Sequence, residues 1–84
     1  MFNFEIRQLE YFVAAASTGS YAQAAKDIFV SPQAVSRGIQ VLEGQLGVDL
    51  IKRGAMGIAC TDFGEDFYQE SKTELQSPER LQNI

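Results

Sequence analysis

Signals that start and stop helices recur at short intervals in the first half of the chain, so only short helices fit there. Ser20 is suited to cap a helix N-terminus. Ser31-Pro32 marks a further start, because serine caps a helix and proline at its first position has no N–H to leave unpaired. Gly19 and Gly47 are placed to end the helices before them. A two-turn helix, a turn of a few residues and a longer capped helix predict a helix-turn-helix.

Apolar residues at helical spacing predict one further helix on each side of this unit. The first covers roughly residues 5–17, and its apolar face consists of Ile6, Leu9, Val13 and Ala16 with Phe12 beside them. Thr61 is suited to cap the last helix, because Asp62 and Glu65 would then lie near its positive N-terminal end. Ser77-Pro78 is expected to end or kink that helix.

After Gly47 the apolar pattern changes from a helical period to alternation. Alternation over residues 48–50 and again over 58–60 predicts two short strands, with "IKRGAMG" and its glycines forming the connection. The expected fold is therefore mainly α: a winged helix-turn-helix with a three-helix core, a two-stranded wing and a C-terminal helix. We expect the winged domain over residues 1–60, and a linker or dimerisation helix with a tail over 61–84.

Charge is distributed unevenly along the chain. The net charge of −4 by itself argues against a nucleic-acid partner, because neutralising phosphates needs a basic surface. Residues 17–56, however, carry four basic and three acidic side chains, whereas residues 57–84 carry two basic and six acidic ones. Most of the acid therefore lies outside the predicted helix-turn-helix.

Several classes of function lack the residues they need. With one cysteine, Cys60, and no histidine, the 84 residues offer neither an internal disulfide nor a Cys/His zinc site. No residue pattern supports a catalytic nucleophile, a phosphate-binding glycine loop or a cofactor, so we expect no enzyme, no metal, no cofactor and no small-molecule ligand. The segment "FEIRQLEYFVAAAS" is interrupted by charges and predicts neither a signal peptide nor a membrane span. The cytoplasm is the expected compartment.

Polar residues form one continuous stripe on the helix that begins at Pro32. The stripe consists of Gln33, Ser36, Arg37 and Gln40, and the opposite face carries Val35, Ile39, Leu42 and Leu46. Such a stripe is either a solvated surface or a surface that reads DNA. Glutamine pairs with adenine, arginine with guanine or phosphate, and serine with bases or phosphate. A helix-turn-helix directly before the stripe favours the DNA interpretation.

Three motifs in this order resemble a known family. They are "QLEYFVAAASTGSYAQAA", "VSPQAVSRGIQVLEGQLGVDL" and the Thr61-to-Gly64 segment "TDFG". Together they are similar to the N-terminal DNA-binding domain of LysR-type transcriptional regulators, over about residues 5–70. The resemblance implies a bacterial, dimeric transcription factor whose third helix enters the major groove and whose wing lies along the minor groove. The family's inducer-binding domain is absent from these 84 residues.

The resemblance also implies which residues contact double-stranded DNA and which contact a partner subunit. The expected DNA contacts are Ser20, Tyr21, Ser31, Pro32, Gln33, Ser36, Arg37, Gln40, Lys52 and Arg53. The expected homodimer contacts on the C-terminal helix are Phe67, Tyr68, Ser71 and Leu75, whereas Phe63 is expected to pack on its own domain. Three features depart from the family. Pro32-Gln33 stands where the family usually has Gln-Pro after the capping serine, which puts Gln33 one position later. Met56 stands where the wing tip often carries arginine, and Gly38 replaces a larger polar residue and removes a possible DNA contact.

A second class of function also fits the sequence. The chain would then be a truncated winged-helix interaction module with weak or no DNA binding, which forms mixed dimers with a full-length regulator. The net charge of −4 and Met56 are consistent with this alternative. The salt dependence of DNA binding separates the two, because counterion release gives a DNA-binding protein a clear negative slope.

Overall fold

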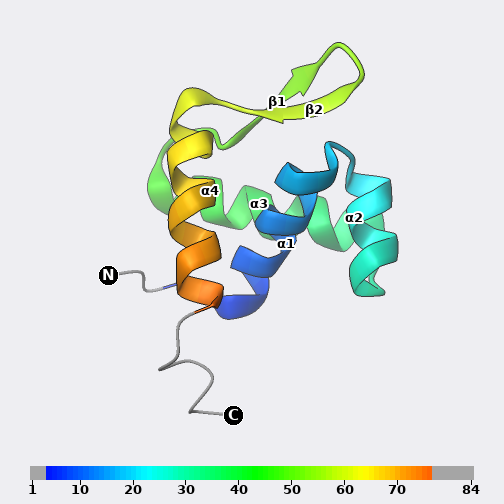
Figure 1. Cartoon of the computed structure of the whole chain (residues 1–84), viewed down its shortest axis with the longest axis horizontal. Helices are drawn as coiled ribbons and strands as arrows, with labels where there is room; N and C mark the ends of the chain where they lie inside the picture. Colours follow the sequence, from blue (N-terminus) through cyan, green and yellow to red (C-terminus); the bar gives the residue numbers. More distant parts are fainter. Residues whose placement is uncertain (1–3, 77–84) are drawn as a thin grey trace.

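Four helices and one β-hairpin make up residues 4–76, the part of the chain that the computed structural model describes (Figure 1). In chain order the elements are α1 (Ile6–Thr18), α2 (Tyr21–Ile28), α3 (Pro32–Leu46), β1 (Ile51–Gly54), β2 (Gly57–Cys60) and α4 (Asp62–Leu75). This order confirms the mainly helical winged helix-turn-helix. The expected end or kink at Ser77-Pro78 and the tail lie outside the described residues.

Three helices begin at the side-chain caps that the sequence predicts. In each, a hydroxyl oxygen accepts a backbone N–H from the first turn and so satisfies a donor that the helix itself leaves free. The three bonds join Ser20 Oγ to the N–H of Gln23 (3.1 Å), Ser31 Oγ to that of Ala34 (3.1 Å) and Thr61 Oγ1 to that of Gly64 (3.0 Å). Pro32 occupies the first turn of α3, as predicted.

Left-handed residues end the first three helices. Gly19 and Gly47 have φ angles of 75° and 76°, which glycine adopts without strain. Phe29 ends α2 with φ 62° and ψ 46°, a conformation that costs a residue with a Cβ about 1–2 kcal/mol. The phenyl ring of Phe29 is 93% exposed, so packing of the side chain does not offset this cost.

The core forms around α1, which lies between α2 and α4 (Figure 1) and also contacts α3 and β2. The buried apolar residues are Leu9, Phe12 and Ala15 of α1, Ala24 and Ala25 of α2, Val35, Ile39 and Leu42 of α3, Leu50, and Phe67 of α4. The ring of Phe67 lies 5.6 Å from that of Phe12 and 6.0 Å from that of Phe4. The fourth helix therefore shares the core of the winged domain.

The wing begins later than the alternation after Gly47 predicts. Strand β1 starts at Ile51 and pairs antiparallel with β2, with Ile51 opposite Cys60 and Gly54 opposite Gly57. The predicted strand over residues 48–50 is therefore wrong. Leu50 is fully buried in the core, and the Glu43 carboxylate accepts the N–H groups of Leu50 (2.9 Å) and Ile51 (3.2 Å). Leu50 is therefore apolar because it packs in the core, not because it belongs to a strand.

The segment that leads into α4 is fixed to the segment before the wing. The Thr61 hydroxyl donates to the Asp49 carbonyl (2.7 Å), and the Thr61 N–H donates to the Leu50 carbonyl (3.0 Å). Gly64 lies against the same Leu50 carbonyl, which leaves no room for a Cβ. The "TDFG" segment therefore joins the two ends of the wing and lets α4 approach the backbone closely.

Candidate nucleic-acid interface

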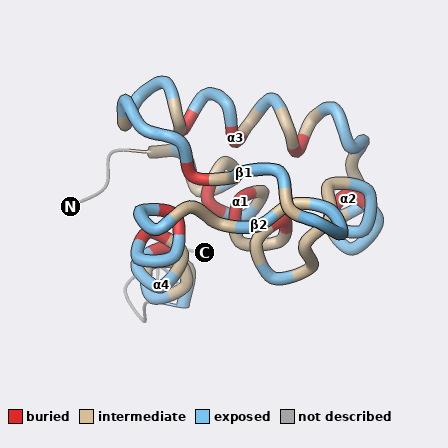
Figure 2. The backbone as a smooth tube through the Cα atoms, turned by 90° about the horizontal axis from the view of Figure 1, so that it is seen from above, coloured by how far each residue is buried: buried red, intermediate tan, exposed pale blue. Residues whose placement is uncertain are grey.

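The exposed positions of α3, which include most of the polar stripe, lie on the side of the helix that faces away from α1 (Figure 2). Gln33, Arg37 and Gln40 are exposed, and Ser36 is half-buried. Within residues 4–76, these four side chains make no hydrogen bond or ion pair with the rest of the protein. Their donors and acceptors are therefore available to a ligand.

The N-termini of α2 and α3 carry hydroxyl groups that are only partly used. Each cap uses an oxygen lone pair of Ser20 or Ser31, and the O–H of the same side chain is still free to donate to another group. The positive ends of helices attract anions such as phosphate. These two helix starts are thus suited to phosphate contacts, and the exposed Pro32 lies beside the second one.

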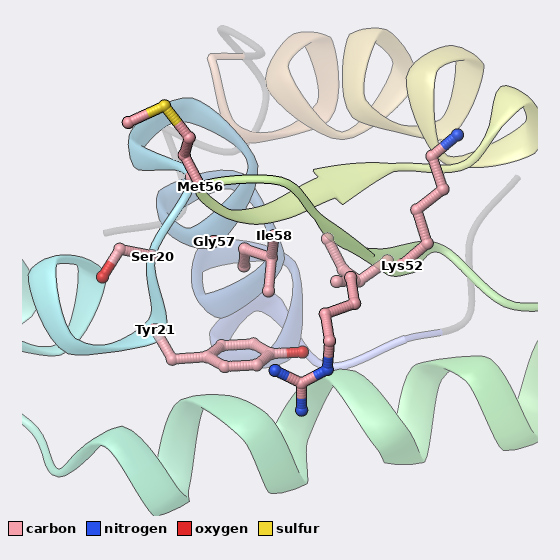
Figure 3. Close-up of a pocket in the computed structure, with 9 residues that line it drawn as sticks. Ser20, Tyr21, Lys52, Met56, Gly57 and Ile58 are labelled. Atoms are coloured by element: carbon pink, nitrogen blue, oxygen red, sulfur yellow. The ribbon is translucent and has the colours of Figure 1, made fainter.

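A pocket of about 380 Å³ separates the start of α2 from the wing (Figure 3). Its lining includes Ser20 and Tyr21 on one side and Lys52, Arg53 and Met56 on the other. Five residues that the sequence places up to 36 positions apart therefore surround one hollow. The groups that line the pocket include a helix N-terminus, a phenol, two cations and a thioether.

Tyr21 lies between the wing and α3 (Figure 3). Partial burial, and after it the nearby Glu43 carboxylate, raise the pKa of the Tyr21 hydroxyl above its ordinary value, whereas Arg53 lowers it. The net increase keeps the phenol protonated at neutral pH, so it acts as a hydrogen-bond donor toward an acceptor such as a phosphate oxygen.

Lys52 and Arg53 do not lie on the same face of the hairpin. Neighbouring side chains on a strand point to opposite faces, and the amine of Lys52 points away from Tyr21 (Figure 3). Arg53 lies close enough to Tyr21 to lower its pKa. Of the two cations that line the pocket, Arg53 is therefore the one beside Tyr21, whereas the amine of Lys52 extends the positive surface of the wing toward its other side.

Gly38 packs against α1. A Cβ at this position would collide with the ring of Tyr11, so Gly38 is the place where the two helices come together. The interpretation of Gly38 as a lost DNA contact is therefore wrong, because a side chain here would point at Tyr11. Sequence reasoning also missed Glu43. Glu43 lies four residues before Gly47, in "LEGQLG". A carboxylate so close to the end of the helix could have indicated that it accepts N–H groups of the segment that follows.

Within residues 4–76, Cys60 and the acidic side chains offer neither an activated nucleophile nor a metal-binding group. Burial, and to a smaller extent Glu65, raise the pKa of the half-buried Cys60 thiol, which lowers its reactivity at neutral pH. Within residues 4–76, no three acidic, cysteine or histidine side chains are grouped as metal ligands. None of the helices in the same range is long and apolar enough to cross a bilayer.

A family model for bacterial regulatory helix-turn-helix proteins of the lysR family matches residues 6–65. The chain belongs to the LysR family. The match covers the three helices, the wing and the first turn of α4, which are the elements that carry the polar stripe and the pocket. LysR-family proteins are regulators, which agrees with the prediction that the chain is no enzyme.

Curated LysR-family relatives are similar over most of this chain. The HTH-type transcriptional regulator TcbR of Pseudomonas sp. (strain P51) is 42% identical over 72 residues, which is 86% of this chain and 24% of TcbR. BenM of Acinetobacter baylyi (strain ATCC 33305 / BD413 / ADP1) is 40% identical over 77 residues, which is 92% of this chain and 25% of BenM. The chain thus spans about a quarter of the length of these relatives.

Solved LysR-family structures share the fold closely. The crystal structure of a CbnR DBD–DNA complex has a TM-score of 0.86 and 39% identity, covering 95% of this chain and 92% of the other. A BenM DBD complex with benA site 1 DNA has a TM-score of 0.86 and 34% identity, covering 95% and 90% of the two chains. Each of these structures holds a domain of this size in complex with DNA.

Of the four residues predicted to contact a partner subunit of this LysR-family chain, two are buried and two are half-buried. Ser71 is fully buried and Phe67 is 4% exposed, so both are covered by their own domain. Tyr68 and Leu75 are half-buried at the edge of the core. Phe63 was expected to pack on its own domain. Its ring stacks on Phe67 at 6.2 Å but is 46% exposed, so that expectation holds only in part.

Proposed function

We propose that this chain is the DNA-binding domain of a bacterial transcriptional regulator and that it binds double-stranded DNA in a sequence-specific way. The observation that carries the proposal is the exposed stripe of α3, whose Gln33, Arg37 and Gln40 have no partner within residues 4–76. Two relatives that match this chain over 95% of its length were solved in complex with DNA, which supports the proposal.

The residues fall into two kinds of DNA contact. The stripe side chains on α3 read base edges in the major groove, because amides and a guanidinium form the paired hydrogen bonds that distinguish bases. The helix starts at Ser20 and Ser31, together with Tyr21 and Arg53 at the pocket, hold phosphates on either side of that groove. The phosphate contacts fix the register in which α3 meets the bases.

We infer further that the chain acts as a homodimer through α4. Tyr68 and Leu75 are seven residues apart, so they lie on the same edge of the helix, two turns from each other. Both retain exposed surface beside the core. Because Phe67 and Ser71 are covered by their own domain, the proposed partner helix lies against the edge formed by Tyr68 and Leu75.

The regulator proposed here controls transcription in the bacterial cytoplasm. The 84 residues correspond to the DNA-binding part of such a protein, because the chain covers only 24% of the length of the regulator TcbR. The net charge of −4 makes non-specific affinity for DNA weak, so base contacts must supply much of the discrimination.

Selection of bound sequences from a random duplex pool, read at two salt concentrations, tests the proposal. We expect enrichment of an interrupted palindrome, because a symmetric dimer reads two half-sites about one helical turn apart or a multiple of it. Affinity for the selected site should fall as salt rises, because bound phosphates release counterions.

Two outcomes would contradict this function. A pool without any enriched sequence would remove sequence-specific binding. Absence of a salt-dependent affinity for any duplex would favour the interaction module that forms mixed dimers with a full-length regulator. Gln40→Ala with Gln45→Ala makes a matched pair, because both glutamines are exposed on α3 and only Gln40 lies on the stripe. Only the Gln40 variant should change the enriched sequence.

A further inference from the structure

The tip of the wing carries an exposed apolar side chain and no charge. Met56 is 98% exposed and therefore gains nothing from packing on its own domain. Its neighbours in the turn are Gly54, Ala55 and Gly57, so the cations nearest to it in the wing, Lys52 and Arg53, lie back along β1. Figure 3 shows the Met56 side chain pointing away from Ile58 and the body of the hairpin.

The position of the tip is fixed relative to the start of α2. The Ile58 N–H donates to the Gly19 carbonyl at 3.1 Å. Gly57 has a φ of 142° and lies against the same carbonyl, so neither the backbone nor the space there suits a side chain. Met56 is one residue from this anchor and lines the pocket beside Ser20 and Tyr21. A duplex held at the start of α2 would therefore meet Met56 at a defined place.

We propose that Met56 is a specificity-determining residue that enters the minor groove as an uncharged contact and favours deformable pyrimidine–purine steps over narrow A-tracts at the flanks of the bound site. The inference rests on the proposed DNA binding and on the position of the wing along the minor groove that the family resemblance implies. Narrow A-tract grooves attract cations through their enhanced negative potential, and a thioether gains nothing from that potential. Apolar side chains, methionine among them, instead insert between base steps that unstack at low cost. The flexible methionine chain is suited to such irregular contacts.

Binding measurements with three variants at position 56 test this inference. The probes are duplexes with one selected core and either an A-tract or a TA or CA step in each flank, at two salt concentrations. Wild type should prefer the TA or CA flanks. Met56→Ala should bind those duplexes about tenfold more weakly, because it loses part of the burial free energy of a large apolar side chain. Met56→Leu should retain most of the affinity and the wild-type flank preference.

Met56→Arg separates an apolar contact from a cationic one. We expect its preference to reverse toward A-tract flanks and its salt slope to steepen by about 1, as one added contact with the phosphate field implies. Val48→Ala is the matched control, because it truncates an exposed apolar side chain outside the wing and should leave all duplexes unchanged. Thermal unfolding should show equal stability for all Met56 variants.

The possible failures are distinguishable from one another. If wild type binds none of the duplexes, the proposed DNA-binding function is overturned and this inference with it. If wild type binds the selected core but Met56→Ala has the same affinity and flank preference as wild type, only the role of Met56 is overturned. A wild-type preference for A-tract flanks would likewise contradict the uncharged contact.

Discussion

Arg37 is the one cation on the exposed stripe of α3, and within residues 4–76 no carboxylate pairs with it. If it reads a guanine, Arg37→Ala should cost about 1–3 kcal/mol on the selected site and relax specificity at one base pair. Titration of the variant on the selected and on random duplexes measures both effects. Arg7→Ala removes an equal charge from an exposed position of α1 and serves as the control. An equal loss on both duplexes would make Arg37 a phosphate contact instead.

Phe29 is the non-glycine residue in the left-handed conformation among the described residues. Since its ring is 93% exposed, replacing it removes little packing. Asparagine tolerates the left-handed region better than phenylalanine does. Phe29→Asn should therefore stabilise the domain by about 0.5–1 kcal/mol and raise the thermal midpoint by several degrees. Phe29→Ala loses the same ring without this tolerance, and a similar gain in that variant would refute the explanation.

At the scale of the element, two glycines of α3 differ only in what surrounds them. Gly44 has open space where a Cβ would lie, whereas at Gly38 a Cβ would collide with the Tyr11 ring. Gly44→Ala should stabilise the helix by about 1 kcal/mol. Gly38→Ala gains the same helix propensity, but its free energy of unfolding should be about 1–3 kcal/mol lower than that of Gly44→Ala because the new Cβ overpacks the contact. Urea unfolding of both variants measures the difference, and equal stabilities would contradict the close approach of α1 and α3.

Glu43 joins α3 to the start of the wing through two backbone N–H groups, at 2.9 and 3.2 Å. Glu43→Ala leaves those donors without their carboxylate and should lower the free energy of unfolding by about 1.5–3 kcal/mol, the range for hydrogen bonds to charged groups. Glu43→Gln retains one acceptor oxygen and should lose less. Glu70→Ala, at an exposed position of α4, is the control, and chemical denaturation supplies the measurement. Losses of equal size at positions 43 and 70 would show that the carboxylate does not hold the wing.

At the scale of the whole molecule, most of the apolar face of α4 is used within the chain. Phe67 and Ser71 are buried, so of the four predicted partner contacts only Tyr68 and Leu75 are left for the proposed second copy. Leu75→Ala should raise the dissociation constant of the proposed dimer by about tenfold, because the interface loses part of the burial free energy of a leucine. Sedimentation over a concentration series measures it.

The control for this interface is Gln69→Ala, an exposed position of α4 that should leave the dimer unchanged. A chain that stays monomeric at every concentration would contradict the dimer itself. An effect of Gln69→Ala as large as that of Leu75→Ala would contradict the choice of edge.

The sequence by itself determined where α2, α3 and α4 begin and where α1 and α3 end, and through its motifs the family to which the chain belongs. Helix ends follow from bonds between residues three or four apart, such as that between Ser31 and Ala34, so neighbouring letters contain the necessary information. It also placed the polar stripe on one face of α3, because helical periodicity is local.

Tertiary structure alone decided the rest. The first strand of the wing starts at Ile51 because Glu43 and the core hold Leu50, and Ser71 is buried because α4 packs on α1. Gly38 contacts Tyr11, which is far away in the sequence. The Gly19 carbonyl contacts the backbone just after Met56 and so fixes the position of the wing tip. Each of these outcomes depends on contacts between residues distant along the chain, and such contacts leave no periodic signal in the letters around any one of them.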